Sequence, residues 1–374
     1  MPRILISGYY GFNNTGDDTV LEGIITALQQ EYKRSSNTGN LELAVLSNQP
    51  KITSELFKIE AYNRWSLKEI RKQLRACDLL IMGGGSLLQD VTSPRSVIYY
   101  LGIAWLAKRF GKPIAFYAQG IGPINHSISK YLMKYIANKV DIITVRDYKS
   151  LLELQNMGIH TPPMYLTADP ALAMDPKQID LTIGENIFKK YGLIPKKDKI
   201  AAISIRIWRK ERAYLQSVAK TADTLIEQGW KVVFIPMHHP MDIAPSQELI
   251  GKMQYRNQAI LIDKKHMNYR EVISMIGNVD FMIGMRLHAV ILAGILGVPF
   301  TAISYDPKID RFVESLDYPT PQHVENLDYD MLMQDIEHKI ENLESAQRYI
   351  KEKIEEVKSV ALKSADLALG LLEE

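Results

Sequence analysis

The segment Phe281-Met282-Ile283-Gly284-Met285-Arg286-Leu287-His288-Ala289-Val290 joins a short apolar run, a glycine and the start of a helical pattern. The apolar run predicts a strand that is buried on both faces, as in a parallel sheet. We expect the helix to begin near His288, so that Arg286 and His288 flank its N-terminus. Backbone N–H groups and the helix dipole attract anions there, and an arginine keeps its charge at any relevant pH. The segment therefore predicts an α/β fold with an anion site at this junction.

Similar apolar runs lie on both sides of this segment and alternate with helical stretches, which is typical of parallel sheets with crossover helices. The runs of the first half are Ile4–Gly8, Leu41–Leu46, Leu79–Met82, Ile114–Ala118, Ile142–Val145 and Met164–Thr167. Those of the second half are Ile200–Arg206, Val232–Pro236, Ile260–Ile262, Phe281–Gly284 and Phe300–Ser304. After Pro170 the pattern lapses through a polar stretch that ends in Pro195–Lys199, and this stretch is predicted to be the interdomain linker. We therefore expect two Rossmann-like, doubly wound domains that face a cleft.

The length of the chain supports two domains, because 374 residues with 46% hydrophobic content exceed a usual single core. We expect residues 1–175 and 176–325 to form these domains. From Tyr329 onward, apolar residues at helical spacing predict one long amphipathic helix within residues 326–374. We expect this segment to pack back on the domains, with a coiled-coil dimer as the alternative.

Composition narrows the classes of function. A formal net charge of +2 argues against a nucleic-acid partner, which usually requires a concentrated basic face. Cys77 is the only cysteine, so the chain can form neither an internal disulfide nor a thiolate metal cluster. The N-terminus runs directly into a strand without the pattern of a signal peptide, and no apolar run reaches transmembrane length. We therefore expect a cytoplasmic protein.

Three loops of the first half follow predicted strands, where ligands of open α/β sheets gather. The loop Gly8–Asp18 lacks the glycine spacing of a dinucleotide fingerprint. Its Asp17 and Asp18 fit an N-cap, and its Asn13-Asn14 pair fits a turn, but the same side chains can also bind sugar hydroxyls. The loops Gly83–Gly85 and Gln119–Pro123 allow close approach to a ligand.

Cationic side chains also follow predicted strands. Arg95 and Arg146 in the first half fit either anion contacts or ordinary salt bridges. In the second half, Arg206 closes a strand, and Lys308 follows the last strand. The pair His238-His239 lacks a third ligand at a recognisable spacing, so we expect no metal and place the pair at the cleft.

Taken together, these segments resemble the polysaccharide pyruvyl transferase family, in particular its CsaB-type members, which pyruvylate cell-wall polysaccharide precursors. The resemblance spans nearly the whole chain and rests on Gly11–Asp18, Gly83–Ser86, Gln119–Pro123 and Gly284–Ala289. It implies a GT-B-like fold with the acceptor side in residues 1–175 and the donor side in residues 176–325. It also implies phosphoenolpyruvate as donor, without a cofactor, and a lipid-linked disaccharide diphosphate containing N-acetylmannosamine as acceptor. The implied product is a 4,6-pyruvate ketal of a secondary cell-wall polysaccharide that anchors an S-layer.

The resemblance also assigns residues. It implies that the donor is bound by Arg206, Arg286, Leu287, His288, Lys308 and Arg146. Of these, Arg286, His288 and Lys308 are the expected catalytic residues, and His288 is the candidate for proton transfer because its pKa ordinarily lies near neutral pH. The acceptor is expected to contact Phe12, Asn13, Asn14, Asp17, Asp18, Gly84, Gly85, Arg95 and Gln119. No metal site is expected.

Two other functions remain open. A nucleotide-sugar glycosyltransferase of similar architecture is the first, although the predicted helix after Arg286 lacks the acidic residue that commonly holds a ribose. A non-catalytic carbohydrate-binding protein is the second. A lipid-linked acceptor would also require membrane contact, which the basic, amphipathic segment Trp65–Arg75 can supply. The alternative is an ordinary surface helix whose apolar stripe faces the core.

Overall fold

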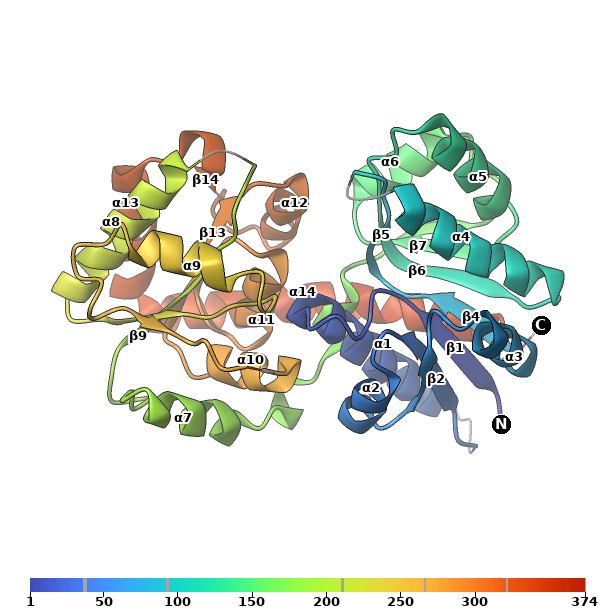
Figure 1. The fold of residues 1–374 in the computed structure, drawn as a ribbon, viewed down its shortest axis with the longest axis horizontal. Helices are drawn as coiled ribbons and strands as arrows, with labels where there is room; N and C mark the ends of the chain where they lie inside the picture. The colour runs from blue at the N-terminus through green and yellow to red at the C-terminus, as the bar shows by residue number, and fades with distance from the viewer. Residues whose placement is uncertain (36–38, 92–93, 210–211, 266, 321, 374) are drawn as a thin grey trace. The chain divides into compact units, whose positions relative to one another are not determined.

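The chain folds into two compact units (Figure 1). The computed structural model describes residues 1–35, 39–91, 94–209, 212–265, 267–320 and 322–373. Unit 1 comprises Met1–Phe12, Asp17–Met174 and Lys358–Glu374, and unit 2 comprises Asn13–Gly16 and Asp175–Val357. Each unit is therefore built from segments that are far apart in the sequence.

Unit 1 contains a parallel sheet in the order β3-β2-β1-β4-β6-β7-β8, with β5 also paired to β6. Its strands are β1 (Arg3–Ser7), β2 (Glu42–Ser47), β3 (Glu60–Asn63), β4 (Leu79–Met82), β5 (Gly85–Leu88), β6 (Ile114–Ile121), β7 (Ile142–Val145) and β8 (Met164–Leu166). The central strands consist of apolar residues buried on both faces, such as Ile4, Leu5 and Ile6 of β1. Continuous apolar runs of this kind are expected where helices cover both faces of a sheet.

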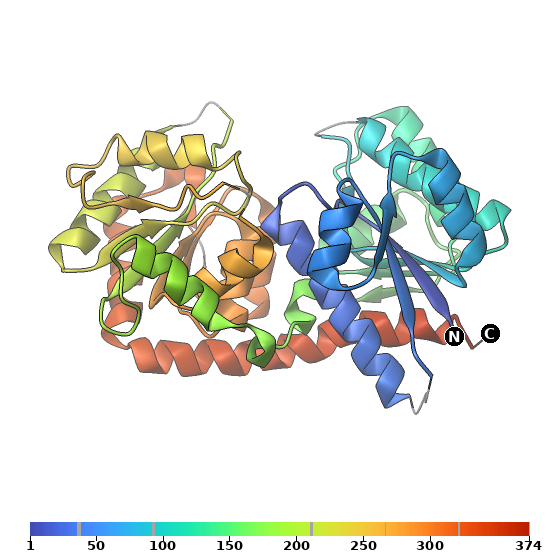
Figure 2. The same ribbon diagram turned by 60° about the horizontal axis from the view of Figure 1, so that its bottom comes forward.

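Helices cover both faces of this sheet. They are α1 (Thr15–Arg34), α2 (Pro50–Phe57), α3 (Leu67–Ala76), α4 (Pro94–Arg109), α5 (Ser127–Ala137) and α6 (Tyr148–Asn156), followed by the 3-10 helix Pro170–Ala173. Apolar residues of α3, α4, α5 and α6 share one buried cluster with the sheet. Thr144 of β7 faces the other side, where Ser364 near the C-terminus bonds to it and to Thr167. The end of the last helix therefore belongs to the core of unit 1 (Figure 2).

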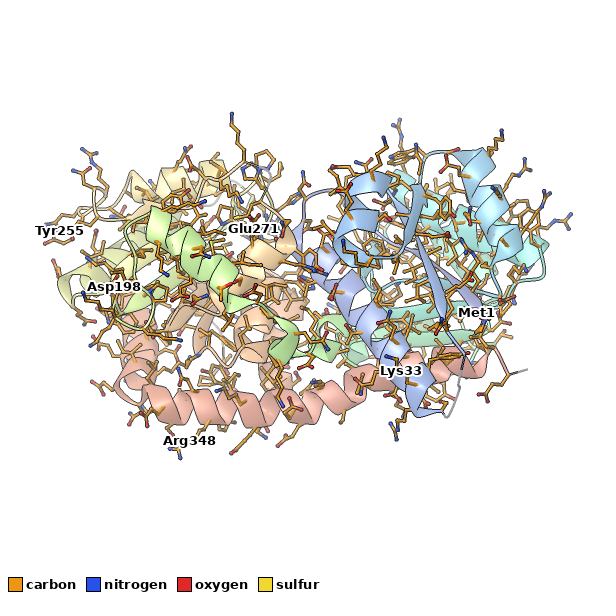
Figure 3. All side chains as sticks on the ribbon, turned by 90° about the horizontal axis from the view of Figure 1, so that it is seen from below. Met1, Lys33, Asp198, Tyr255, Glu271 and Arg348 are labelled. Carbon is orange, nitrogen blue, oxygen red and sulfur yellow. The ribbon has the colours of Figure 1, made fainter. Side chains whose placement is uncertain are left out.

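Unit 2 contains a second parallel sheet, in the order β11-β10-β9-β12-β13-β14. Its strands are β9 (Ile200–Ser204), β10 (Lys231–Phe234), β11 (Ile260–Leu261), β12 (Phe281–Gly284), β13 (Phe300–Ser304) and β14 (Gln322–His323). Its α-helices are α7 (Leu181–Lys190), α8 (Ala213–Glu227), α9 (Ile243–Ile250), α10 (Tyr269–Ile276), α11 (Leu287–Ile295), α12 (Pro307–Ser315), α13 (Tyr329–Glu341) and the first part of α14 (Leu343–Gly370). The 3-10 helices Pro176–Gln178 and Val324–Asn326 complete the unit. In both units, side chains fill the spaces between helices and sheets (Figure 3). Lys33 of α1 and Arg348 of α14 are exposed.

The expected fold class, α/β with two parallel sheets and a long C-terminal helix, is confirmed by these elements. The apolar runs did not reveal β3, β5 and β14, because β3 and β14 are only partly buried and β5 begins at Gly85. The polar stretch predicted as an interdomain linker contains the boundary between the units, which lies between Met174 and Asp175. The rest of the stretch is not a linker, because helix α7 within it belongs to unit 2, where Gly184 lies against the backbone of Ser274 in α10.

The C-terminal segment contains two helices where the sequence predicts one. Asn342 leaves the helical conformation, with φ −117° and ψ 41°, and separates α13 from α14. The apolar stripe is buried on both sides of this break, for example at Ile336 and Ile350. Helical spacing alone does not show a break of one residue, because the apolar side chains return to the core after it. No helix in the described part of the chain is both long and apolar enough to cross a membrane.

Candidate functional site

The junction between β12 and α11 lies at the centre of the sheet of unit 2, because β12 pairs with both β9 and β13. Gly284 ends the strand, and a Cβ at this position would lie 2.6 Å from the Val290 side chain. The glycine therefore lets α11 pack close to the strand that precedes it. Arg286 is the N-cap of α11, and Leu287 and His288 occupy its first turn. Leu287, a predicted donor contact, has a buried side chain.

Arg286 is held by a carboxylate that the sequence pattern did not connect with it. Its Nε donates to Asp242 Oδ2 at 3.1 Å, and its NH2 donates to Asp242 Oδ1. The Asp242 side chain is only 1% exposed, and its Oδ2 also accepts the backbone N–H groups of Met237 and His238. A bidentate pair fixes the plane of the guanidinium and leaves further N–H groups for a ligand. Asp242 therefore orients Arg286.

His288 lies beside the N-terminal loop of the chain. A Cβ on Gly16 would clash with Nδ1 of the His288 imidazole. The same loop pairs with the segment after β10, since Asn14 forms an antiparallel bridge with His238 and the N–H of Thr15 donates to Met237 O at 3.0 Å. Asn13 and Asn14, predicted to bind the acceptor, thus belong to the same unit as the expected donor residues Arg286 and His288.

Arg206 and its aromatic neighbours lie at the carboxyl ends of β9 and β13. Arg206 NH1 donates to Tyr305 OH at 2.7 Å, and its guanidinium lies 4.5 Å from the centre of the Tyr305 ring. The Trp208 and Tyr305 ring centres are 5.0 Å apart. Lys308 Nζ lies 3.3 Å from the carboxylate of Asp306. The sequence pattern missed Tyr305, although it directly follows a predicted strand.

Three buried polar atoms at this end of β9 are candidates for ligand contacts. Among the residues that the structure describes, Ser204 Oγ, Arg206 Nε and Trp208 Nε1 are buried and have no hydrogen-bond partner. They come from alternate residues, which share one side of an extended segment. A buried donor without a partner costs roughly 1–3 kcal/mol, so a site that presents several favours a ligand that accepts hydrogen bonds. Because one of these three groups belongs to the positively charged Arg206, the site suits a ligand that is an anion.

Arg146, the remaining predicted donor contact, belongs to unit 1 and is buried there. Its NH1 donates to Asp169 Oδ2 at 2.6 Å, and its NH2 donates to Ser86 Oγ at 3.0 Å. Its guanidinium also packs against Gly120, where a Cβ would lie 2.9 Å from NH2. Arg146, which directly follows β7, therefore links β5, the end of β6 and the segment after β8. The sequence pattern missed Asp169 as its partner.

The glycine-rich loop after β4 is tightly enclosed. A Cβ on Gly84 would lie 2.7 Å from the Pro170 side chain, and Gly85 has φ +99°, which favours glycine. Gln119, another predicted acceptor contact, is buried and donates from Nε2 to the carbonyl of Met82 at 2.8 Å. Gly84 and Gln119 thus shape the backbone of the loop.

Two neighbouring carboxylates lie in the first turn of α1, and one of them, Asp17, faces this loop. A Cβ on Gly85 would lie 3.5 Å from Asp17 Oδ1. Burial, together with the charge of Asp17, raises the pKa of Asp18 to about 7. A carboxyl group that titrates near neutral pH can accept or release a proton under physiological conditions.

The remaining predicted acceptor residues lie in two places of unit 1. Phe12 stacks on Tyr9, with ring centres 4.0 Å apart and planes 7° apart. Arg95 is exposed in the first turn of α4. Among the described residues, no group of three or more histidine, cysteine, aspartate or glutamate side chains could hold a metal ion.

Comparisons with known proteins address the family and the fold. The sequence profile described as polysaccharide pyruvyl transferase matches residues 14–307. The amylovoran biosynthesis protein AmsJ of Erwinia amylovora is 24% identical over 368 residues, which cover 85% of this chain and 86% of AmsJ.

Two solved structures show the same fold at low sequence identity. HepE of Anabaena, in complex with UDP-glucose, is 10% identical, with a TM-score of 0.67 and full coverage of both chains. The UDP-GlcNAc 2-epimerase of Neisseria meningitidis, bound to UDP-GlcNAc, is 13% identical, with a TM-score of 0.63 and full coverage of both chains. These similarities confirm the GT-B-like class of fold.

Proposed function

The chain belongs to the polysaccharide pyruvyl transferase family, and from this premise we propose a specific donor and acceptor for it. The family makes the chain a transferase that places pyruvyl groups on polysaccharide. We propose that the donor is phosphoenolpyruvate. The proposed acceptor is an N-acetylmannosamine residue of a lipid-linked disaccharide diphosphate, a precursor of secondary cell-wall polysaccharide. The proposed products are the 4,6-pyruvate ketal, through which an S-layer is anchored, and phosphate.

The observation that carries this proposal is the set of buried donors without partners at the end of β9. Phosphoenolpyruvate presents a phosphate and a carboxylate close together, so it requires several donors and more than one cation. Arg206 Nε and Trp208 Nε1 are buried donors without a partner among the described residues. Arg286 and Lys308 add two further cations in the same unit. Charge-assisted hydrogen bonds of this kind are roughly twice as strong as neutral ones.

The proposed reaction needs one proton at carbon and two hydroxyl attacks. A proton adds to the methylene carbon of phosphoenolpyruvate, and the cation that forms at C2 is attacked by one sugar hydroxyl, which loses its proton. The bond between C2 and the phosphate oxygen then breaks, and phosphate leaves with the electron pair. The second hydroxyl attacks C2 and loses its proton, which closes the ketal. We assign the first proton transfer to His288, and Arg286 and Lys308 stabilise the charge of the departing phosphate.

A His288→Ala variant tests the assignment of His288. We expect the rate of phosphate release from phosphoenolpyruvate, in the presence of acceptor, to fall by ~10²–10⁴-fold, the usual contribution of general acid–base catalysis. Circular dichroism should show that the fold persists. Wild-type kcat in this variant would disprove the proton-transfer role.

A nucleotide-sugar glycosyltransferase is the second candidate, because HepE and the epimerase bind UDP-sugars in structures with this fold. Helix α11, Leu287–Ile295, contains no acidic residue that could hold a ribose. Thermal shift separates the two functions. A ligand at 100 times its Kd stabilises by about 2.7 kcal/mol, so we expect a clear rise in Tm with phosphoenolpyruvate. A rise with UDP-glucose alone would favour the glycosyltransferase.

We also propose that the protein works at the cytoplasmic face of the membrane, where a lipid-linked acceptor would be found. Only the basic side of helix α3 supports this proposal. Its apolar residues Ile70 and Leu74 are buried in unit 1, so its stripe faces the core, as the alternative of an ordinary surface helix predicts. Its opposite side forms an open groove that carries four basic side chains, and it is lined by Leu67, Lys68, Arg71, Lys72, Arg75 and Ala76. Each basic residue near an anionic bilayer contributes about 1 kcal/mol.

Flotation with liposomes tests the membrane contact. The double variant Lys68→Glu with Arg71→Glu should lose binding to vesicles that contain anionic lipid. The matched control is Lys196→Glu with Lys197→Glu, which reverses two exposed charges of unit 2 and should leave binding unchanged. Equal binding of the wild type to neutral and anionic vesicles would rule out the proposed contact.

A further inference from the structure

An aromatic cluster of unit 1 surrounds a buried arginine. The guanidinium carbon of Arg64 lies 4.6–5.9 Å from the centres of five rings, those of Tyr9, Phe12, Trp65, Tyr99 and Tyr100. Arg64 is only 3% exposed, and its guanidinium donates to Gly8 O at 2.8 Å and to Tyr100 OH at 3.2 Å. Cation–π contacts of a desolvated arginine are worth up to about 2 kcal/mol each. The arginine therefore fixes the rings around it.

Trp65 is the exposed member of this cluster. It is 62% exposed, whereas the guanidinium of Arg64 lies 5.0 Å from the centre of its ring. Its Nε1 donates to Asn48 Oδ1 at 2.8 Å, so the polar edge of the indole is held by the protein. Arg64 and Asn48 thus fix the orientation of the ring, while most of its surface stays open to solvent. Held in this way, the ring loses little freedom when a ligand covers it.

Two amides, Asn48 and Asn63, bond to Trp65, and a third, Gln49, follows Asn48 in the chain. Asn63 is exposed and accepts the backbone N–H of Trp65 at 2.9 Å. Asn48 and Gln49 each donate to the carbonyl of Gly11, at 3.3 Å and 3.0 Å, and are partly exposed. An apolar surface with a few fixed amide groups at its edge is typical of sites for neutral polar ligands.

We propose that Trp65 stacks against a pyranose ring of the glycan acceptor. The C–H groups on one face of a pyranose carry partial positive charge and match the negative face of an aromatic ring, while its hydroxyl groups can bond to the surrounding amides. Arg64 is a positioning residue in this subsite, since it is buried among the rings. The inference rests on the proposed function in taking the ligand to be a glycan. It adds a contact between the protein and the sugar that involves none of the residues expected to take part in the reaction.

The test uses the lipid-free disaccharide that contains N-acetylmannosamine, because a soluble probe separates sugar binding from membrane binding. Calorimetry gives its Kd, and phosphate release with phosphoenolpyruvate gives KM and kcat. For Trp65→Ala we expect the Kd and KM of the disaccharide to rise about tenfold, with kcat and the KM of phosphoenolpyruvate close to wild type. Trp65→Phe keeps an aromatic face and should restore most of the affinity. Trp105→Ala is the matched control, since Trp105 is 48% exposed on α4 of the same unit.

The outcomes separate this inference from the proposed function. If the wild type binds the disaccharide in a manner that depends on Trp65 but releases no phosphate, the proposed function fails and the subsite stands. If the wild type turns over the disaccharide and Trp65→Ala has unchanged Kd and KM, the subsite is wrong and the function stands. The subsite is also wrong if the wild type does not bind the disaccharide, or if Trp65→Ala loses only vesicle binding.

Discussion

Buried aspartates hold two of the arginines in place. Asp242 holds Arg286 in unit 2, and Asp169 holds Arg146 in unit 1. A carboxylate partner fixes the plane of a guanidinium and partly offsets the cost of burying its charge. An arginine that is oriented before its ligand arrives loses less freedom on binding. At the residue scale, the geometry of each site therefore depends on the buried aspartate as much as on the arginine that it holds.

Asp242→Asn should weaken unit 2 and its site together. The amide keeps one acceptor oxygen for the backbone but turns an NH2 group toward Arg286, whose charge then lacks its partner. We expect a loss of about 2 kcal/mol in the free energy of unfolding and a higher KM for phosphoenolpyruvate. Urea denaturation and steady-state kinetics measure these effects. Asp330→Asn, at an exposed position of α13, is the control. Unchanged stability would show that Asp242 does not hold Arg286.

Asp18 predicts a dependence of stability on pH. Its pKa is about 7 in the folded protein and ordinarily 3.8, so between these values the folded state binds more protons than the unfolded state. The stability contributed by the neutral carboxyl is complete below pH 3.8 and is lost as pH rises through 7. Asp18→Asn is neutral at every pH, so we expect it to gain stability relative to wild type. The gain should be larger at pH 8 than at pH 5, by about 1 kcal/mol or more. Equal changes in Tm at both values would contradict the raised pKa.

At the scale of elements, glycines set how closely helices pack. Gly284 brings α11 against its own strand, and Gly184 brings α7 against the backbone of α10. In both places a Cβ would meet atoms closer than ordinary van der Waals contact. A sequence pattern marks these positions only as glycines within or beside a helix. Whether a larger residue would fit at such a position depends on how closely the neighbouring helix or strand packs against it.

A pair of alanine substitutions tests this distinction. Gly184→Ala places a Cβ against the backbone of Ser274, which cannot move as a side chain does, so we expect a loss of about 1–3 kcal/mol. Gly102 lies in α4 with no atom within 4 Å of a Cβ, and Gly102→Ala should gain about 0.5–1 kcal/mol, because alanine favours the helix. Chemical denaturation of both variants measures the difference. The explanation fails if Gly184→Ala is as stable as Gly102→Ala.

At the scale of the whole molecule, both units are assembled from distant parts of the chain. Asn13–Gly16 belongs to unit 2 although the rest of the first 174 residues form unit 1. Helix α14 supplies residues to both units, with the division at Lys358. The N-terminal loop and the C-terminal helix therefore each contribute to both cores.

Removal of residues 358–374 should destabilise unit 1. The truncation removes the buried residues Ala361 and Ala365, and it leaves the hydroxyls of Thr144 and Thr167 without Ser364. We expect calorimetry to show unit 1 unfolding at a lower temperature, while unit 2 keeps its own transition. Truncation after Gly370 removes only the last residues and should leave both transitions in place. A single unchanged transition in the longer truncation would contradict this assignment.

The residues by themselves determined the α/β class, the positions of most strands along the chain and the family. Of the strands expected from apolar runs, β4, β7, β12 and β13 have the predicted bounds. These features are local, because a strand buried on both faces must be apolar along its whole length. The motif around Arg286 can also be recognised in a single segment, because its strand, glycine and helix follow one another directly in the chain.

Only the tertiary structure decided which side chains meet. Asp242 and Arg286 are 44 positions apart, and Arg146 and Asp169 are 23 positions apart. Gly16 lies near the N-terminus, whereas its neighbour His288 lies in the second half of the chain. The rings around Arg64 come from three separate segments. Such pairs depend on how loops and sheets bring distant residues together, and the periodicity of a single segment contains no information about its partners.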